Sequence, residues 1–240
     1  MYVIPIVYDQ VNRWARDDEF FMKLLKKVSP EKIADLGCGT GRLTTHFSEA
    51  GYQITAIDPN EEAIECAKGK AYRNDVMWIV GDSSNLEEDA YDTVIMTANV
   101  AQVFLTDESW QQVLSDVYRA LKPGGHLIFD TRNPAAKAWE QWEKDDTPDH
   151  AIDDQNGEPL LIWTDYEGFK GNVYSFYETV VNARTDTVLV REKMQLRFRS
   201  YDVIAESLQA AGFASFQAYH DWSFEEANPY TKSFIFHAVK

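Results

Sequence analysis

Apolar residues recur along the chain with two spacings, one typical of helices and one of buried strands. Helical spacing is clear in residues 11–28, and Pro30 follows, so we predict a helix over that range. The pattern predicts further helices at residues 41–50, 61–68, 109–121 and 202–211. Short apolar runs predict strands at residues 32–36, 52–57, 76–80, 91–97, 126–130, 215–221 and 233–239. Because strands and helices alternate, we expect a mainly parallel sheet with right-handed crossovers.

This alternation stops between residues 131 and 200. Residues 140–158 contain eight acidic residues and one lysine, so we expect a helix end followed by a solvated loop. Three strand-like runs follow, at residues 160–168, 172–181 and 188–199. In the last run apolar and mostly basic side chains alternate, which indicates an antiparallel sheet with one covered face. We therefore predict an α/β domain of residues 1–130 and 201–240, and an insert of residues 131–200.

A glycine-rich loop joins the first predicted strand to the next helix. Asp35 lies at the strand end, and Gly37, Gly39 and Gly41 follow it. Glycines let the backbone approach a ligand closely, although the same residues can simply form a tight turn. A dinucleotide-binding loop, G-x-G-x-x-G, needs glycine where this chain has Arg42. Since a carboxylate repels pyrophosphate and attracts an ammonium group, the loop favours S-adenosylmethionine over NAD.

Two more aspartates follow later strands of the same predicted sheet. Asp58 comes directly after residues 52–57, and Asp82 comes shortly after residues 76–80. Open α/β sheets bind ligands at the carboxyl ends of their strands. At this edge Asp58 can accept hydrogen bonds from ribose hydroxyls and Asp82 from an adenine amino group, although each can instead cap a helix or turn.

The chain resembles class I S-adenosylmethionine-dependent methyltransferases over residues 33–130. The resemblance is carried by ADLGCGTG at residues 34–41, by Asp58, by Gly81-Asp82 and by LKPGGHLIFD at residues 121–130. It implies an α/β fold with a Rossmann-like, doubly wound sheet of seven strands, the last of them antiparallel. The insert then lies between the fifth and sixth strands as a small antiparallel β subdomain that covers the substrate.

The resemblance also implies a binding site for the methyl donor. The glycine loop and the residues after the fourth strand surround the methionine part, Asp58 holds the ribose, and Asp82 with Ser83 faces the adenine. Tyr8 belongs to an N-terminal segment that closes over the donor. The implied donor-binding residues are Tyr8, Asp35, Gly37, Cys38, Gly39, Gly41, Asp58, Pro59, Asp82, Ser83, Thr97 and Asn99.

The acceptor site is harder to infer from the residues. Methyl transfer from an activated sulfonium depends on alignment and a dry pocket, so we assign no catalytic residue. Residues 97–100 lack the Asn/Asp-Pro-Pro-Tyr/Phe motif of enzymes that methylate nucleobase or glutamine amides. The insert resembles the substrate-covering sheet of some small-molecule N-methyltransferases. The candidate acceptor-binding residues are Arg132, Tyr166, Tyr174, Tyr177 and Arg197.

The composition narrows the range of partners. The formal net charge is −16, which disfavours nucleic acids and anionic membranes and suits a small neutral or cationic acceptor. Cys38 and Cys66 form no C-x-x-C pair, so we expect no metal. The first residues have no signal-peptide pattern and no apolar run is long enough to span a bilayer, so we expect a cytoplasmic protein. We also expect a monomer or a homodimer.

Three alternative functions remain open at this stage. A non-catalytic module that senses S-adenosylmethionine would have the same donor site. An aminopropyltransferase would use the same scaffold with the decarboxylated donor. An NAD-dependent dehydrogenase is disfavoured by Arg42. The leading interpretation is a methyltransferase that acts on a small-molecule acceptor at N or O.

Overall fold

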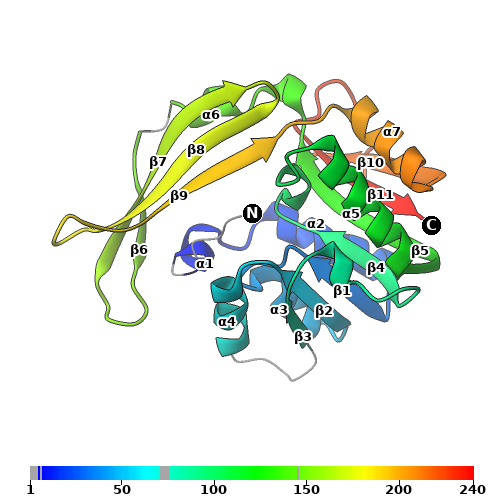
Figure 1. Ribbon diagram of the computed structural model, residues 1–240, viewed down its shortest axis with the longest axis horizontal. Helices are drawn as coiled ribbons and strands as arrows, with labels where there is room; N and C mark the ends of the chain where they lie inside the picture. Colours follow the sequence, from blue (N-terminus) through cyan, green and yellow to red (C-terminus); the bar gives the residue numbers. More distant parts are fainter. Residues whose placement is uncertain (1–4, 6, 71–75, 145) are drawn as a thin grey trace.

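The computed structural model describes residues 5, 7–70, 76–144 and 146–240, which form two β-sheets (Figure 1). The larger sheet has seven strands in the order β10-β11-β5-β4-β1-β2-β3. The strands are β1 (Lys32–Leu36), β2 (Gln53–Asp58), β3 (Val76–Val80), β4 (Tyr91–Met96), β5 (Leu121–Arg132), β10 (Ser215–His220) and β11 (Ser233–Val239). Strands β1 to β5 pair in parallel, whereas β11 runs antiparallel to β5 and β10. This arrangement confirms the predicted fold class.

Helices cover both faces of the larger sheet, as a doubly wound fold requires. They are α2 (Arg16–Val28), α3 (Arg42–Glu49), α4 (Glu61–Gly69), α5 (Asp107–Ala120) and α7 (Tyr201–Ala211). Helices α2 and α3 bury Phe21 and Phe47 in one apolar cluster, and α5 and α7 bury Trp110 and Leu208 in another. The apolar stripe of each amphipathic helix thus forms part of the core.

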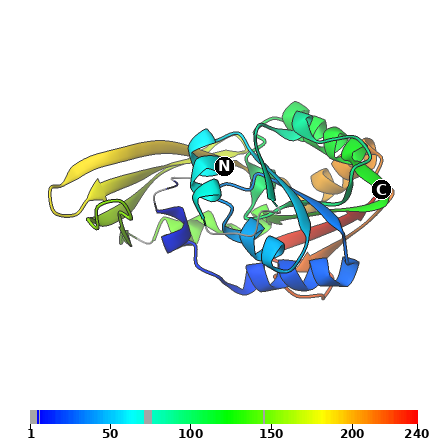
Figure 2. The ribbon, with the colours of Figure 1, turned by 90° about the horizontal axis from the view of Figure 1, so that it is seen from below.

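The smaller sheet lies in the chain between β5 and β10, where the insert was expected. It is antiparallel, with the order β6-β7-β8-β9. Its strands are β6 (Asp149–Ile152), β7 (Pro159–Lys170), β8 (Val173–Asn182) and β9 (Thr187–Arg197). Figures 1 and 2 show that it projects from one end of the larger sheet, beside the short helix α1 (Tyr8–Val11). Val7 packs among its apolar side chains, which ties the N-terminal segment to the insert.

The helix predicted over residues 11–28 is observed as α2 from Arg16, and a break at residues 12–15 separates it from α1, which ends at Val11. Helix α1 ends where the Asn12 side chain donates to the carbonyl of Tyr8, at 2.9 Å. Helix α2 begins after Ala15, which is extended and donates its backbone N–H to Asp18 at 2.9 Å. Local hydrogen bonds therefore outweigh the apolar periodicity at residues 12–15. The predicted helix is confirmed over residues 16–28, and its predicted start was wrong.

The acidic stretch at residues 140–158 also differs from its prediction. It contains the end of the short helix α6 (Trp139–Trp142) and an additional edge strand, β6. Ala151 on β6 is buried in the apolar cluster under the smaller sheet, while the neighbouring residues are exposed. Strand β6 is short and only Ala151 is buried, so its sequence shows no alternation of apolar and polar residues that would predict a strand.

Candidate functional site

The glycine loop after β1 is held against the end of β2. The backbone N–H groups of Gly37 and Cys38 donate to the carbonyl of Ile57 at 2.7 and 3.2 Å. Gly37 has a φ of 79°, and a Cβ built on it would lie 2.7 Å from methyl carbons of Val100. Only glycine fits this conformation and this close approach. The loop backbone is therefore fixed at the carboxyl edge of the sheet.

Asp58 is the second support of this loop. It lies at the end of β2 and is 2% exposed. Its carboxylate accepts the backbone N–H of Gly39 at 2.8 Å and that of Asn60 at 2.9 Å. Burial raises the pKa of Asp58, while these two hydrogen bonds favour its charged form. The residue implied to hold the ribose thus also positions the glycine loop.

Asp35 presents an unsatisfied acceptor beneath the loop. Its Oδ2 atom accepts the hydroxyl of Thr44 at 2.6 Å, whereas its buried Oδ1 atom has no partner within the described ranges. Burial raises the pKa of Asp35 to about 7, and the charge of Asp58 adds to the rise. A buried acceptor without a donor is costly, so this position suits a ligand that supplies a cationic N–H group.

The segment after β4 has a strained backbone. Ala98 and Asn99 have φ values of 54° and 64° although neither is glycine. The backbone N–H of Asn99 donates to both oxygens of Asp130 at 3.0 Å, and the buried Oδ1 of Asn99 has no partner among the described residues. Burial raises the pKa of Asp130 to about 7. Backbone strain of this kind is concentrated at functional sites.

Three cavities adjoin this edge of the larger sheet. The narrowest is lined by Tyr8, Asp35, Gly37, Cys38, Gly39, Arg42, Leu43, Thr97, Ala98 and Val100. A second, of about 470 Å³, is lined by Pro59, Asn60, Val103, Leu105, Met194, Gln195 and Leu196. The third, of about 430 Å³, lies between the N-terminal segment, residues 98–99 and the smaller sheet. Most of the implied donor residues therefore border a cavity.

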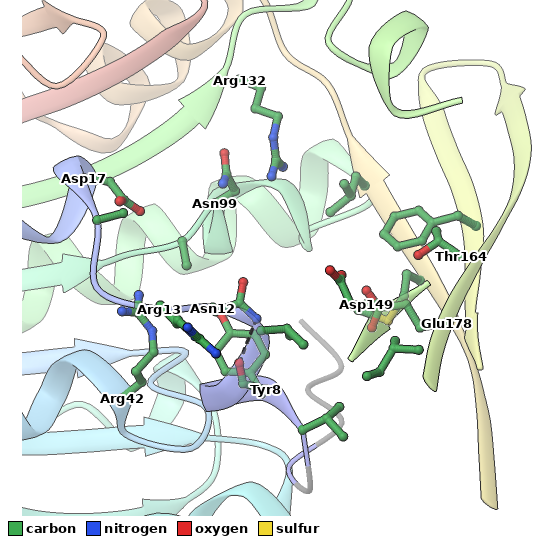
Figure 3. A pocket seen from close by; sticks show the side chains of 18 residues that line it. Tyr8, Asn12, Arg13, Asp17, Arg42, Asn99, Arg132, Asp149, Thr164 and Glu178 are labelled. Atoms are coloured by element: carbon green, nitrogen blue, oxygen red, sulfur yellow. Dashed lines mark hydrogen bonds between the residues drawn. The ribbon is translucent and has the colours of Figure 1, made fainter. Parts of the chain in front are cut away.

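The largest group of polar side chains faces the third cavity, which we call the acceptor cavity (Figure 3). It is lined by Val7, Tyr8, Val11, Asn12, Arg13, Ala15, Asp17, Arg42, Ala98, Asn99, Arg132, Asp149, Ile162, Thr164, Phe176, Glu178, Met194 and Leu196. Tyr8 borders both this cavity and the narrow one. Burial raises the pKa of Tyr8 to about 12, so its phenol keeps its proton at neutral pH.

Arg132 reaches the acceptor cavity from the end of β5. Its guanidinium stacks over the ring of Trp142 at 4.9 Å and donates to Oε1 of Gln102 at 2.9 Å. Figure 3 shows this guanidinium pointing into the cavity, next to Asn99. Burial lowers the pKa of Arg132, while the charge of Asp130 offsets part of that effect. Two fixed contacts thus orient the remaining N–H donors of Arg132.

Four implied residues do not line the three cavities. Gly41 and Asp58 lie behind the loop, where a Cβ on Gly41 would meet Trp78 at 2.5 Å. Asp82 is exposed and accepts the N–H and hydroxyl of Ser84, which lower its pKa. Ser83 donates its hydroxyl to Asp116 at 2.7 Å. Asp82 therefore caps the short helix at Ser83–Asn85, and Ser83 joins that helix to α5.

The three tyrosines predicted to bind the acceptor are absent from the lining of the acceptor cavity. Tyr174 is fully buried and donates its hydroxyl to Glu143 at 2.6 Å. Tyr166 packs beside Tyr174 and Phe176 in an aromatic cluster. Tyr177 lies on the opposite face of the smaller sheet, beneath Arg191. Successive strand residues point to opposite faces, so Tyr177 is corrected from a cavity residue to an outer-face residue.

Arg197 is a second correction. It pairs across the strands with Val173 and lies on the same face as Tyr177. Its Nη2 atom donates to both oxygens of Asp107, at 3.2 and 3.3 Å. Because Asp107 begins α5, this ion pair joins the insert to the larger domain. Arg197 therefore serves a structural contact outside the acceptor cavity.

Several functional candidates were missed from the sequence, chiefly Asp130, Asp149 and Glu178. Asp130 lies near the carboxyl end of β5, as Asp35 and Asp58 lie near the carboxyl ends of β1 and β2. Glu178 lies on the inner face of β8, two residues after Phe176 in the same alternation. Burial raises the pKa of Glu178 to about 7, and the charges of Glu192 and Asp149 contribute. The sequence signal for Glu178 was an acidic residue at a strand position whose alternation places it on the covered, otherwise apolar face.

The described part of the chain offers neither a cluster of metal ligands nor a membrane-spanning helix. No group of three or more His, Cys, Asp or Glu side chains lies close enough together there to hold a metal ion. None of the helices in residues 7–70, 76–144 and 146–240 combines the length and apolar character needed to cross a bilayer.

A family model described as "Methyltransferase domain" matches residues 33–125 of this chain. The "Putative methyltransferase YqeM" of Bacillus subtilis is 28% identical over 167 residues, which are 68% of this chain and 65% of that protein. The "Cypemycin N-terminal methyltransferase" of a Streptomyces species is 34% identical over 106 residues, or 43% of this chain and 42% of that protein. Each alignment thus spans less than two thirds of the relative.

Solved structures align over nearly the whole chain. An S-adenosylmethionine-dependent methyltransferase from Clostridium acetobutylicum has a TM-score of 0.73 at 17% identity, covering 97% of this chain and 96% of that one. The sugar N-methyltransferase KedS8 from a Streptoalloteichus species has a TM-score of 0.75 at 16% identity, covering 100% and 93%. These structures share the fold of this chain, including the region of the insert.

Proposed function

We propose, from the premise that this chain belongs to the class I S-adenosylmethionine-dependent methyltransferases, that it methylates a small-molecule acceptor at a nitrogen or oxygen atom. One observation carries the proposal. The glycine-loop cavity and the acceptor cavity meet at Tyr8 and Ala98, so a donor and an acceptor can be brought together there.

The residues at the glycine loop fit the donor by charge and by shape. The buried Oδ1 atoms of Asp35 and Asn99 have no partner among the described residues, and they can accept N–H groups of a methionine moiety. Gly37 leaves room for close approach. The carboxylates of Asp35 and Asp58 disfavour a pyrophosphate at the same place. We assign the donor to this loop, with Pro59 and Asn60 bordering the nucleoside part.

S-adenosylmethionine, when bound, supplies a methyl carbon that is already activated by its sulfonium. The chain then has to orient the acceptor and exclude water. Tyr8 borders the junction of the two cavities and keeps its proton, so it acts by hydrogen bonding and by covering the site. Asn99 is fixed by Asp130 and presents its side chain at the same junction.

The acceptor cavity supports a small polar acceptor. Its volume of about 430 Å³ is in the range of small-molecule sites. Arg132 and Glu178 place opposite charges on its walls, and Ile162, Met194 and Leu196 supply apolar surface. We propose that residues 131–200 act as the insert that covers the acceptor, attached to a domain of residues 1–130 and 201–240. Arg132 is our candidate for binding an anionic or carbonyl group of the acceptor.

The test is a turnover screen. The protein is incubated with S-adenosylmethionine and a panel of amines, amino acids, amino sugars and phenols, and the release of S-adenosylhomocysteine is measured together with a methyl mass shift. We expect at least one acceptor to gain a methyl group, and Arg132→Ala to raise the KM for it. Failure of calorimetry to detect binding of S-adenosylhomocysteine would refute the proposal. Tight binding without turnover across the panel would favour a donor-sensing module.

A further inference from the structure

We propose that Glu178 selects acceptors that carry a protonated amine, and that its carboxylate binds this ammonium group in the acceptor cavity. The inference rests on the proposed function, because it names the class of acceptor for the same cavity. It is carried by the distribution of charge on the two faces of the smaller sheet.

The outer face of the smaller sheet pairs its acidic residues with basic ones. Oδ2 of Asp165 on β7 lies 3.2 Å from Nη2 of Arg191 on β9. Oε2 of Glu167 lies 2.7 Å from Nζ of Lys193. These ion pairs are exposed and need no ligand.

The inner face is different, because among the described residues its acids form no ion pair with a basic side chain. Glu178 pairs directly across the strands with Glu192 on one side and with Thr164 on the other. Within the described ranges, no hydrogen bond or ion pair joins Glu178 to another residue, and the buried Oε2 of Glu192 also has no partner. Like charges placed directly opposite each other on neighbouring strands destabilise a sheet. A cationic group of a bound ligand would therefore relieve the repulsion between Glu178 and Glu192.

The cavity gives such a ligand a defined place. Asp149 of β6 lies beside Glu178 and adds to the negative potential of this wall. Across the cavity, Arg132 points inward from the core, and Figure 3 shows the two side chains on opposite sides of the open space. Tyr8 lies within electrostatic range of both Glu178 and Arg132. An acceptor is thus oriented with its ammonium toward the smaller sheet.

Two facts argue that this acid serves a ligand and is not a core defect. Burial raises the pKa of Glu178 to about 7, and the negative charges of Glu192 and Asp149 contribute to the rise. At pH 8 the carboxylate is ionised, but its charge is poorly stabilised in the ligand-free protein. Thr164 and Phe176 line the cavity together with Glu178. Figure 3 shows Glu178 beside the open space of the cavity. A bound ammonium ion supplies the countercharge and the N–H donors that the wall lacks.

The experiment measures the binding of matched fragments at pH 8 to protein saturated with S-adenosylhomocysteine. The probes are benzylamine and benzyl alcohol, and cyclohexylamine and cyclohexanol, and their dissociation constants are measured by ligand-observed NMR. We expect each amine to bind the wild-type protein about tenfold more tightly than its alcohol. In Glu178→Gln this ratio should fall to about one.

Glu167→Gln is the matched control, because it makes the same change on the outer face and should leave the ratio unchanged. S-adenosylhomocysteine should bind both variants with wild-type affinity. If the wild-type protein shows no preference for amines, or if the preference survives in Glu178→Gln, the inference is overturned while the proposed function stands. If the wild-type protein does not bind S-adenosylhomocysteine, the proposed function itself fails.

Discussion

The carboxylate of Asp58 accepts the backbone N–H of Gly39 at 2.8 Å, and this contact couples the end of β2 to the glycine loop. A second N–H, from Asn60, occupies its other oxygen. Each carboxylate oxygen can accept more than one hydrogen bond, so Asp58 can support the loop and still accept from a ribose hydroxyl. Loss of this side chain should therefore disturb donor binding in two ways.

We expect Asp58→Ala to weaken binding of S-adenosylhomocysteine by about 1–3 kcal/mol, which is roughly five- to 150-fold in Kd. Isothermal titration calorimetry measures the change directly. Asp165→Ala, on the outer face of the smaller sheet, serves as a control and should bind like the wild-type protein. Wild-type affinity in Asp58→Ala would contradict the ribose assignment.

The pKa of Asp35 leads to a prediction about pH. Burial raises this pKa to about 7 from an ordinary 3.8, so the ligand-free carboxyl is mostly neutral at pH 6 and ionised at pH 8. The ionised form attracts the ammonium group of the donor. Affinity for S-adenosylhomocysteine should therefore rise between pH 6 and pH 8, by up to about tenfold per pH unit below the pKa.

Asp35→Asn should flatten this pH profile. The part that remains is expected from Asp130, whose pKa burial also raises to about 7. Calorimetry at pH 6, 7 and 8 on both proteins measures the two slopes. An affinity that falls with rising pH, or a variant with the wild-type slope, would contradict the assignment of Asp35 to the ammonium group.

The sequence was most informative where one residue type is required by the backbone. Gly37 has a positive φ and a close neighbour in Val100, so only glycine fits, and the loop could be placed from its glycines alone. The strand ends at Asp35 and Asp58 were predictable for a related reason. Parallel strands bring their carboxyl ends to one edge, whichever residues pack between them.

The acceptor cavity was less predictable because it depends on contacts between distant segments. Strand alternation assigns Tyr177 and Glu178 to opposite faces but does not say which face is covered. Tyr174 lies on the inner face, yet its hydroxyl is used by Glu143 of a neighbouring segment. The break at residues 12–15 depends on the Asp18 cap, which periodicity does not register. The covered face and the partner of Tyr174 depend on tertiary contacts, whereas the break at residues 12–15 depends on a local hydrogen bond.

Glu178→Gln should stabilise the ligand-free protein at pH 8. The pKa of Glu178 is raised from 4.5 to about 7 in the folded state, so between these values the folded protein binds more protons than the unfolded chain. The free energy of unfolding of the wild-type protein therefore falls as the pH rises through this window. The charges of Glu192 on β9 and Asp149 on β6 act on Glu178, and both are negative. Tyr8 of α1 keeps its proton, and the charge of Arg132 lies on the opposite side of the cavity.

We expect the glutamine variant to gain on the order of 1–3 kcal/mol at pH 8 and little at pH 4.5. Urea denaturation at the two pH values measures the difference. Glu167→Gln removes an exposed ion pair with Lys193 and should leave the free energy of unfolding nearly unchanged at either pH. A loss of stability in Glu178→Gln would mean that the carboxylate has a favourable partner in the folded protein.

The ion pair of Asp18 and Arg42 joins α2 to the start of α3, directly after the glycine loop. Asp18 is 1% exposed, and its two oxygens accept from Nη1 and Nη2 of Arg42 at 2.8 and 2.7 Å. Arg42→Met leaves this buried carboxylate with only the N–H of Ala15. We expect the free energy of unfolding to fall by about 3–5 kcal/mol, because an uncompensated buried charge is costly.

The double variant Asp18→Leu/Arg42→Met separates this cost from the value of the pair itself. It removes both charges, so most of the lost stability should return, apart from about 1 kcal/mol for the missing cap at Ala15. Binding of S-adenosylhomocysteine should remain weaker than in the wild-type protein, since Arg42 also borders the glycine-loop cavity. Urea denaturation and calorimetry measure the two effects independently. If the double variant is no more stable than Arg42→Met, the ion pair of Asp18 and Arg42 is itself a net source of stability. We expect the opposite, because burying two charges costs about as much free energy as their attraction returns.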